Sequence, residues 1–161
     1  MGILRIVSYS EEAFRDRVTA GRLLANELAN WRGQQAVVLG IPRGGLVVAR
    51  ELARAIDADL DIVLSRKLRT PGHEELALGA VAEDGKVFLN DVVVQELGIN
   101  SGSAYIRQEK AVQMAEIARR AELIRRVRPK VPLQGRIAIV TDDGVATGAT
   151  MQAALWAARQ E

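Results

Sequence analysis

Two adjacent carboxylates, Asp142 and Asp143, stand directly after a short apolar run in the segment RIAIVTDDGVATGAT, which spans residues 136–150. The run at residues 137–140 is of the kind that forms a strand buried on both faces of a parallel sheet. Nothing in the packing of a strand requires two acids at its end. Their position therefore indicates chemistry, in which carboxylate oxygens hold sugar hydroxyls or magnesium-bound water.

Small and hydroxylated residues follow the two acids and lead into a helix expected over residues 149–159. The backbone N–H groups of such a turn and the positive end of the helix dipole converge on one point, which favours an anion such as a monophosphate. The loop contains neither the Gly-Lys-Ser/Thr tripeptide of a P-loop nor the GxGxxG of a dinucleotide fold. The residues of this expected phosphate cradle are Gly144, Val145, Ala146, Thr147, Gly148, Ala149 and Thr150.

The order of apolar strand, Asp-Asp, three residues and Thr-Gly-x-Thr resembles the signature with which type I phosphoribosyltransferases bind phosphoribosyl pyrophosphate (PRPP). The resemblance implies that Asp142 and Asp143 hold the 2- and 3-hydroxyls of the ribose. Magnesium would bridge these hydroxyls and the pyrophosphate, with the two carboxylates holding it through water. The backbone of residues 144–150 would then hold the 5-phosphate. A buried strand followed by an ordinary turn is the alternative, and it leaves the paired acids unexplained.

A second candidate segment is the turn Pro42-Arg43-Gly44-Gly45, which follows a strand expected at residues 36–39. Ligands of open α/β sheets bind at the carboxyl ends of the strands, and here glycine N–H groups stand beside a guanidinium. In the resembled family the corresponding loop contacts the pyrophosphate of PRPP, so the resemblance gives Arg43 and Gly44 this role. A tight turn that carries a solvated arginine is the alternative interpretation.

A third candidate segment is the basic stretch SRKLR at residues 65–69, which follows a strand expected at residues 59–64. Its cations, followed by Pro-Gly, predict the end of a strand and then a mobile loop. Two short strands, at residues 76–81 and 86–89, are expected to form a hairpin beyond it. Arg69 is expected to be solvated.

This loop and hairpin resemble the flexible loop that closes over PRPP in the type I phosphoribosyltransferases. The resemblance makes Arg66 and Lys67 candidates for neutralising the pyrophosphate as it leaves. A solvated basic loop is the alternative.

The acceptor is the least determined part of the resemblance. Hypoxanthine-guanine enzymes carry an acid immediately before Thr-Gly, whereas this chain has Ala146 there, which disfavours a 6-oxopurine acceptor. Adenine-type enzymes use a loop carboxylate to contact the base. Glu74 or Glu75 is therefore the candidate for base contact and for acid or base catalysis.

Other elements must bring these segments together at one edge of a sheet. Apolar periodicity predicts helices over residues 11–31, with Ser10 as the N-cap, and over residues 46–56, 90–98 and 105–127. Alternating strands and helices predict one α/β domain over residues 1–161, with three layers and a mainly parallel sheet.

Composition excludes several other classes of protein. The chain has 161 residues, of which 48% are hydrophobic and 26% charged, as in a single globular domain. With no cysteine and one histidine, it has neither a disulfide framework nor a thiolate or multi-histidine metal site. It lacks a secretory signal pattern and an apolar run of membrane-spanning length, so we expect a cytoplasmic protein.

The function implied by the resemblance is transfer of the 5-phosphoribosyl group from PRPP to a nitrogenous base, with magnesium as cofactor and a place in nucleotide salvage. The alternative is a regulator of the same fold that senses PRPP and binds nucleic acid with little or no catalysis. A net charge of only +2 and the lack of aromatic residues interleaved in the basic helix at 105–127 disfavour nucleic-acid binding.

Family members usually continue beyond the signature helix with further strands, whereas this sequence ends at Glu161. We therefore expect a domain that lacks its last core strands. The signature strand would keep an unpaired edge, with open backbone donors and acceptors beside Ile137 and Ile139. Such an edge predicts that the chain is not a stable monomer in isolation. It then forms a homo-oligomer, or it is a truncated form whose site is assembled but weakened.

Overall fold

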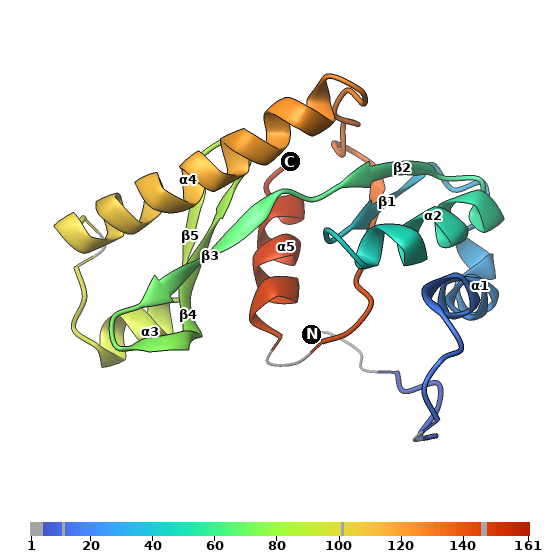
Figure 1. Cartoon of the computed structure of the whole chain (residues 1–161), viewed down its shortest axis with the longest axis horizontal. Coiled ribbons are helices and arrows are strands. Elements are labelled where there is room, and N and C mark those ends of the chain that lie inside the picture. Colours follow the sequence, from blue (N-terminus) through green and yellow to red (C-terminus); the bar gives the residue numbers. More distant parts are fainter. Residues whose placement is uncertain (1–4, 11, 101, 146–147) are drawn as a thin grey trace.

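The computed structural model describes residues 5–10, 12–100, 102–145 and 148–161. Within these residues the strands form two three-stranded sheets, one parallel and one antiparallel. Helix α5 (Ala149–Arg159) lies between the two sheets in the middle of the molecule (Figure 1). No helix in this part of the chain is long and apolar enough to cross a membrane.

The parallel sheet has the strand order β2–β1–β6 and carries two of the candidate segments at its edge. Strand β1 (Ala36–Gly40) pairs with β2 (Asp59–Ile62) on one side and with β6 (Ile137–Thr141) on the other. The last residues of the three strands are in register, so the turns that follow them start at the same edge. Every residue of β1 is buried, which explains its uninterrupted apolar sequence.

Helices cover both faces of the parallel sheet and give the domain three layers. On one face lie α1 (Arg17–Glu27) and α2 (Gly45–Ile56), and α5 covers the other (Figure 1). The core shared with α2 includes Val38, Ala49, Leu52 and Ile56, and the core shared with α5 includes Val37, Leu39, Ala154 and Ala157. The predicted three-layer α/β fold is confirmed.

The antiparallel sheet, with strand order β3–β4–β5, stands beside α5. It consists of β3 (Ser65–Thr70), β4 (His73–Ala82) and β5 (Val87–Leu89). Helices α3 (Asp91–Glu96) and α4 (Ala104–Arg125) pack against this sheet. The predicted hairpin is present as β4 and β5, although β4 begins earlier than expected.

The basic stretch after β2 forms strand β3, so the prediction of a mobile loop there was wrong. Leu68 is fully buried in a core that it shares with Leu78 and Val81, while Arg69 is exposed. The long strand β4 supplies backbone partners along the whole of β3. The sequence gives little sign of this strand, because Leu68 is its only apolar residue.

The first helix is shorter than predicted. It begins at Arg17 with Asp16 as its N-cap, because the carboxylate of Asp16 accepts a hydrogen bond of 2.7 Å from the backbone N–H of Thr19. Ser10 accepts from a nearby backbone N–H outside the helix, and Phe14 is 65% exposed. The apolar spacing that placed Phe14 in the helix was therefore misleading, because the cap at Asp16 starts the helix after it. The 3-10 helix η1 (Ala29–Trp31) follows α1.

Strand β6 pairs only with β1 among the described residues. Ile137 and Ile139 are half-buried, and Ala138 between them is exposed. The unpaired edge is thus lined by backbone groups and small apolar surface. Self-association through it stays a prediction.

A buried ion-pair cluster fixes the end of α4 to the parallel sheet. Arg125 Nη1 lies 2.7 Å from Asp61 Oδ1, and its Nη2 lies 2.8 Å from Glu83 Oε2. The side chain of Asp61 is only 2% exposed, and its other oxygen accepts a hydrogen bond of 2.9 Å from the N–H of Val131. Hydrogen bonds to Glu83 and then to Asp61 outweigh burial and raise the pKa of Arg125. One guanidinium therefore joins α4, the end of β4 and strand β2.

Replacing Asp61 by alanine should destabilise the fold by about 3 kcal/mol, because it leaves a half-buried guanidinium without one of its partners. Asp59 on the same strand is the matched control. It pairs with Arg136 at 2.7 Å but is 56% exposed. Asp59→Ala should therefore cost less than about 1 kcal/mol. Urea unfolding of both variants measures the difference, and equal losses would contradict the importance of the cluster.

Candidate functional site

The turn after β1 and the loop after β6 are in direct contact. A methyl group added to Gly44 would overlap the carboxylate of Asp143, although the backbone angles of Gly44, φ −66° and ψ −39°, suit any residue. A methyl group on Gly45 would lie 2.9 Å from the Cα of Asp142. The two glycines are therefore required by space, and the PRGG turn and the Asp-Asp pair form one composite site.

The two acids of the signature have different surroundings. Arg17 Nε lies 2.6 Å from Asp143 Oδ2, and the N–H of Asp143 donates a hydrogen bond of 2.8 Å to Asp142 Oδ1. The hydrogen bond from Arg17 lowers the pKa of Asp143, whereas burial raises the pKa of Asp142. Asp143 is thus a compensated anion, and Asp142 is the less solvated acceptor of the pair.

The loop beyond the acids leads into α5 through Gly148. This glycine has φ +81°, in the left-handed region that favours glycine, and stands at the N-cap of α5. Thr150 in the first turn of the helix lines a cavity, while Gly144 and Val145 are exposed. Two further residues predicted for the phosphate cradle, Ala146 and Thr147, lie outside the described residues.

A cavity of about 500 Å³ separates the edge of the parallel sheet from β3 and α4. Its volume is in the range of small-molecule sites. Its polar lining consists of Arg43 from the turn after β1, Ser65, Arg66, Lys67 and Arg69 from β3, Gln113 and Arg120 from α4, and Thr150 from α5. The described lining residues include five cations and neither Asp nor Glu. Such a cavity suits a polyanion.

The cations of this cavity differ in how far they are compensated. Arg120 pairs with Glu116 at 2.8 Å, and Arg69 Nε lies 3.9 Å from Glu109. The guanidinium of Arg43, by contrast, has neither a hydrogen bond nor an ion pair to any residue that the structure describes. Arg43 therefore offers its full charge to a ligand.

The structure brings most of the predicted residues to one place. Arg43, Arg66, Lys67 and Thr150 line the cavity, and the acids adjoin it through the contact of Asp143 with Gly44. Glu74 and Glu75 belong to β4, and their side chains lie outside the description.

Sequence reasoning missed Arg17, Gln113 and Arg120, and it did not assign Ser65 or Arg69 to the site although both line the cavity. Arg17 and Arg120 resemble the many other arginines on helix surfaces, so the sequence offers no signal for them. Gln113 does offer one, since it is a polar residue on the apolar face of α4 with Ile106 and Ile117.

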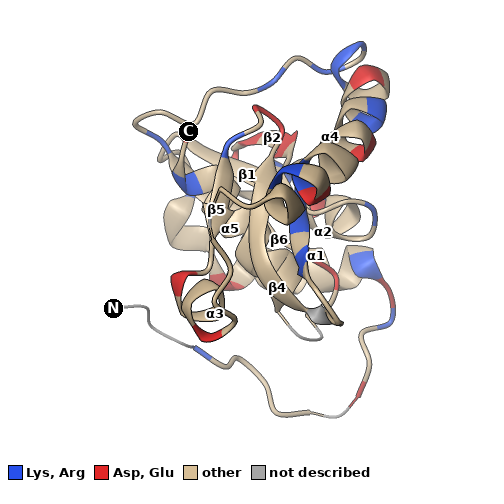
Figure 2. Cartoon of the chain, turned by 90° about the vertical axis from the view of Figure 1, so that its left-hand side faces the viewer, with Lys and Arg blue, Asp and Glu red and all other residues tan. Residues whose placement is uncertain are grey.

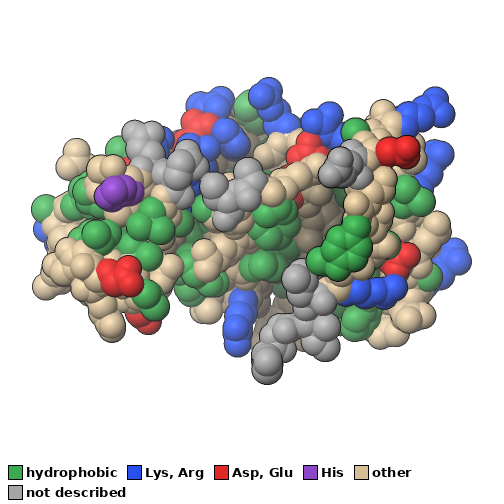
Figure 3. All heavy atoms as spheres, turned by 90° about the horizontal axis from the view of Figure 1, so that it is seen from below, with side chains coloured by type: hydrophobic (Ala, Val, Ile, Leu, Met, Phe, Trp, Pro, Cys, Tyr) green, Lys and Arg blue, Asp and Glu red, His purple; other side chains and the backbone are tan. Residues whose placement is uncertain are grey.

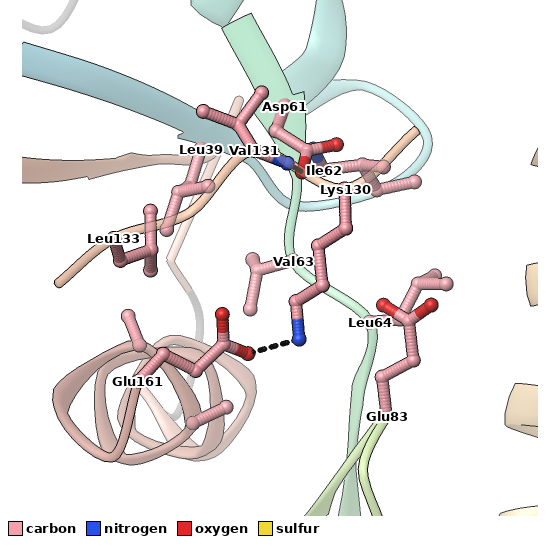
Figure 4. A pocket seen from close by; sticks show the side chains of 12 residues that line it. Leu39, Asp61, Ile62, Val63, Leu64, Glu83, Lys130, Val131, Leu133 and Glu161 are labelled. Carbon is pink, nitrogen blue, oxygen red and sulfur yellow. Dashed lines mark hydrogen bonds and ion pairs between the residues drawn. The ribbon is translucent and has the colours of Figure 1, made fainter. Parts of the chain in front are cut away.

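A second, much smaller cavity of about 10 Å³ lies near the C-terminal end of α5. The side chain of Lys130 extends along it, and its Nζ pairs with Glu161 at 2.5 Å near Val63 (Figure 4). It has room for about one water molecule. Its polar side chains are compensated, so it is not a candidate site.

Many of the basic residues on helix α4 are paired with acids. Basic and acidic residues alternate along the ribbon of α4 (Figure 2), where Arg119 and Arg120 pair with Glu116, and Arg126 with Glu122. Over the antiparallel sheet the lower face is mostly apolar or neutral (Figure 3). The ion pairs along α4 thus compensate Arg119, Arg120 and Arg126.

The comparisons with known proteins agree with this geometry. A family model described as the phosphoribosyl transferase domain matches residues 15–159. The crystal structure of TT1426 from Thermus thermophilus is similar with a TM-score of 0.84 and 47% sequence identity, over 93% of this chain and 70% of that chain.

Two curated Mycobacterium tuberculosis proteins are also similar. Rv0571c of strain H37Rv and MT0597 of strain CDC 1551, whose names carry the provisional description phosphoribosyl transferase, are each 49% identical over 146 residues. The match covers 91% of this chain but only 32% of either relative. The chain thus spans about one third of the length of these curated relatives.

Replacing Arg17 by alanine should raise the pKa of Asp143, because the hydrogen bond from Arg17 is the largest cause that lowers it. The pair stabilises the fold above the unfolded pKa of an aspartate, about 3.9, and this contribution is lost as the pH falls through the native pKa. The stability difference between wild type and variant should therefore be constant near pH 7 and shrink below about pH 4. Carboxyl-carbon NMR titration measures the pKa of Asp143, and urea unfolding at several pH values measures the stability difference. Arg32→Ala, which removes an exposed arginine elsewhere, is the control and should leave the pKa of Asp143 unchanged.

Replacing Gly44 by alanine should displace the carboxylate of Asp143 from its contact with the turn, because the added methyl group occupies the same space. The helical backbone angles of Gly44 accept alanine, so the free energy of unfolding should change by less than about 1 kcal/mol. The displaced carboxylate should lose its bond to Arg17, and its pKa should rise as in Arg17→Ala. An Asp143 pKa that stays at its wild-type value would show that the two loops are not in contact in solution.

Proposed function

Since the chain belongs to the phosphoribosyl transferase domain family, we propose that it transfers the 5-phosphoribosyl group of PRPP to a nitrogenous base and releases pyrophosphate. The observation that carries this proposal is the cavity of about 500 Å³ with its five cations, which adjoins the Asp-Asp pair and the start of α5. The cavity would take the pyrophosphate of PRPP. The Asp-Asp pair would take the ribose with its two hydroxyls, and the start of α5 would take the 5-phosphate.

The pyrophosphate end of PRPP would lie against Arg43, Arg66 and Lys67. As the bond from C1 of the ribose to the pyrophosphate oxygen breaks, its electron pair goes to the pyrophosphate. The acceptor nitrogen forms the new bond to C1 and gives up its proton, for which Glu74 or Glu75 is the candidate base. Cations that are already in position stabilise the charge that develops on the leaving group. The protein also holds the acceptor and C1 within reach of each other, which lowers the entropic part of the barrier.

The sugar and the 5-phosphate would lie at the signature segment. Asp142 and Asp143 accept hydrogen bonds from the ribose hydroxyls, and the backbone N–H groups of residues 144–150 hold the phosphate at the start of α5. Glu74 or Glu75 stays the candidate for contact with the base. The ribose hydroxyls would have to share or replace the bond that Arg17 makes with Asp143 at 2.6 Å.

Magnesium is compatible with the side chains of this site. The described residues contain no group of three or more His, Cys, Asp or Glu that could hold a metal by themselves. Magnesium, however, is usually bound by one or two carboxylates together with waters and substrate phosphates, and the adjacent pair Asp142 and Asp143 suits that mode. When bound, it would supply further neutralisation of the pyrophosphate.

Replacing Asp143 by asparagine should lower the turnover rate at least tenfold, which corresponds to about 1.4 kcal/mol of transition-state stabilisation. Pyrophosphate release from PRPP with magnesium, measured across a panel of bases, is the assay. Asp57→Asn is the matched control, because Asp57 is exposed and has φ 54°, a conformation that asparagine adopts readily. An unchanged rate in Asp143→Asn would contradict the proposed role.

The same panel distinguishes the enzyme from a PRPP-sensing regulator of this fold. PRPP binding without turnover for every acceptor would favour the regulator. Pyrophosphate release that depends on one base would favour the transferase and would identify its acceptor.

A further inference from the structure

Gln113 is a buried polar side chain in the wall of the cavity. It lies on the inner face of α4 and is only 2% exposed, beside the buried apolar residues Ile106 and Ile117. Polar groups in such surroundings are costly unless they are hydrogen-bonded, so the contacts of Gln113 indicate what it does.

Both ends of the Gln113 amide are engaged. Its Oε1 accepts a hydrogen bond of 2.9 Å from Arg66 Nε, and its Nε2 donates one of 2.8 Å to Glu109 Oε1. The same Glu109 oxygen accepts a hydrogen bond of 3.2 Å from the backbone N–H of Arg69. Because the oxygen of the amide faces a cation and its nitrogen faces an anion, only one orientation of Gln113 satisfies both neighbours.

The bond to Nε leaves the terminal nitrogens of Arg66 available. They form no hydrogen bond or ion pair with a described residue, and Arg66 lines the cavity. A planar guanidinium held at one nitrogen keeps a fixed pair of donors for a phosphate. A glutamate in place of Gln113 would hold the arginine equally well but would also neutralise it, as Glu116 does to Arg120.

We propose that Gln113 is a positioning residue for Arg66, which it aims at the pyrophosphate of PRPP without reducing its charge. This inference rests on the proposed function, in which Arg66 binds the pyrophosphate. Helix α4, which carries none of the predicted site residues, thereby contributes a residue to the site.

The test is a double-mutant cycle between Gln113→Met and Arg66→Ala, with binding of pyrophosphate and of ribose 5-phosphate measured by calorimetry in the presence of magnesium. Methionine keeps the length and volume of the side chain but removes the hydrogen bonds. Gln113→Met should weaken pyrophosphate binding roughly tenfold, the equivalent of one hydrogen bond to a charged group. Ribose 5-phosphate, which probes the signature segment alone, should bind as before. In the Arg66→Ala background, Gln113→Met should have no further effect on pyrophosphate.

Gln108→Met is the matched control, because Gln108 is exposed on the same helix. It should leave the affinity for both ligands unchanged. If Gln113→Met weakens both ligands equally, or weakens pyrophosphate as much without Arg66 as with it, Gln113 has only a structural role and the inference is wrong.

Arg66→Lys tests the same inference with Gln113 in place, also if Gln113→Met does not fold. Lysine keeps the charge but has no Nε–H for Gln113 to hold, so pyrophosphate binding should fall nearly as far as in Arg66→Ala. Wild-type affinity in Arg66→Lys would overturn the inference. A wild-type chain that binds neither PRPP nor pyrophosphate would overturn the proposed function itself, so the two failures are distinguishable.

Discussion

The contact between Gly44 and the carboxylate of Asp143 is the constraint on which the rest of the site depends. It exists because β1 and β6 are neighbours in a parallel sheet and end in register, which places the turn after one strand against the loop after the other. A side chain at position 44 would separate them. The small residues of the PRGG turn are therefore a consequence of strand order, and the turn that carries Arg43 lies against the loop that carries the acids.

The opposite wall of the cavity depends on a different interaction. Strand β3 belongs to the antiparallel sheet, and helix α4 packs against that sheet. Their residues face the parallel sheet only if α4 keeps its position. Arg125, held by Asp61 from β2 and by Glu83 after β4, fixes that position at one end of the helix. The cations on β3 and α4 thus face Arg43 because a buried ion pair outside the cavity joins the two parts of the domain.

The sequence predicted the three-layer fold and the signature segment well, because these depend on local patterns. An apolar run, two acids and a glycine before a helix are read from neighbouring residues, and the structure has β6, the Asp-Asp pair and Gly148 in those positions. Strand β3 was missed because tertiary pairing with β4 overrode the local composition. Arg17 and Gln113 were missed because their roles depend on contacts with residues far away in the chain, which single-residue properties do not encode.

In the part of the chain that the structure describes, some charged side chains of the site are compensated by ion pairs and others are not. This difference determines how the binding energy would be divided between the leaving group and the ribose. Arg17 already compensates Asp143, and Glu116 compensates Arg120, so a ligand group that uses either residue competes with an existing ion pair. Arg43 has no such partner among the described residues, and Gln113 holds Arg66 without neutralising it. A leaving group that gains negative charge during the reaction would therefore meet its strongest attraction at Arg43 and Arg66. A ribose that carries no charge would have to displace or share the bond between Arg17 and Asp143. In the proposed reaction this asymmetry would favour the charge that develops on the leaving group over the uncharged part of the substrate, as catalysis requires.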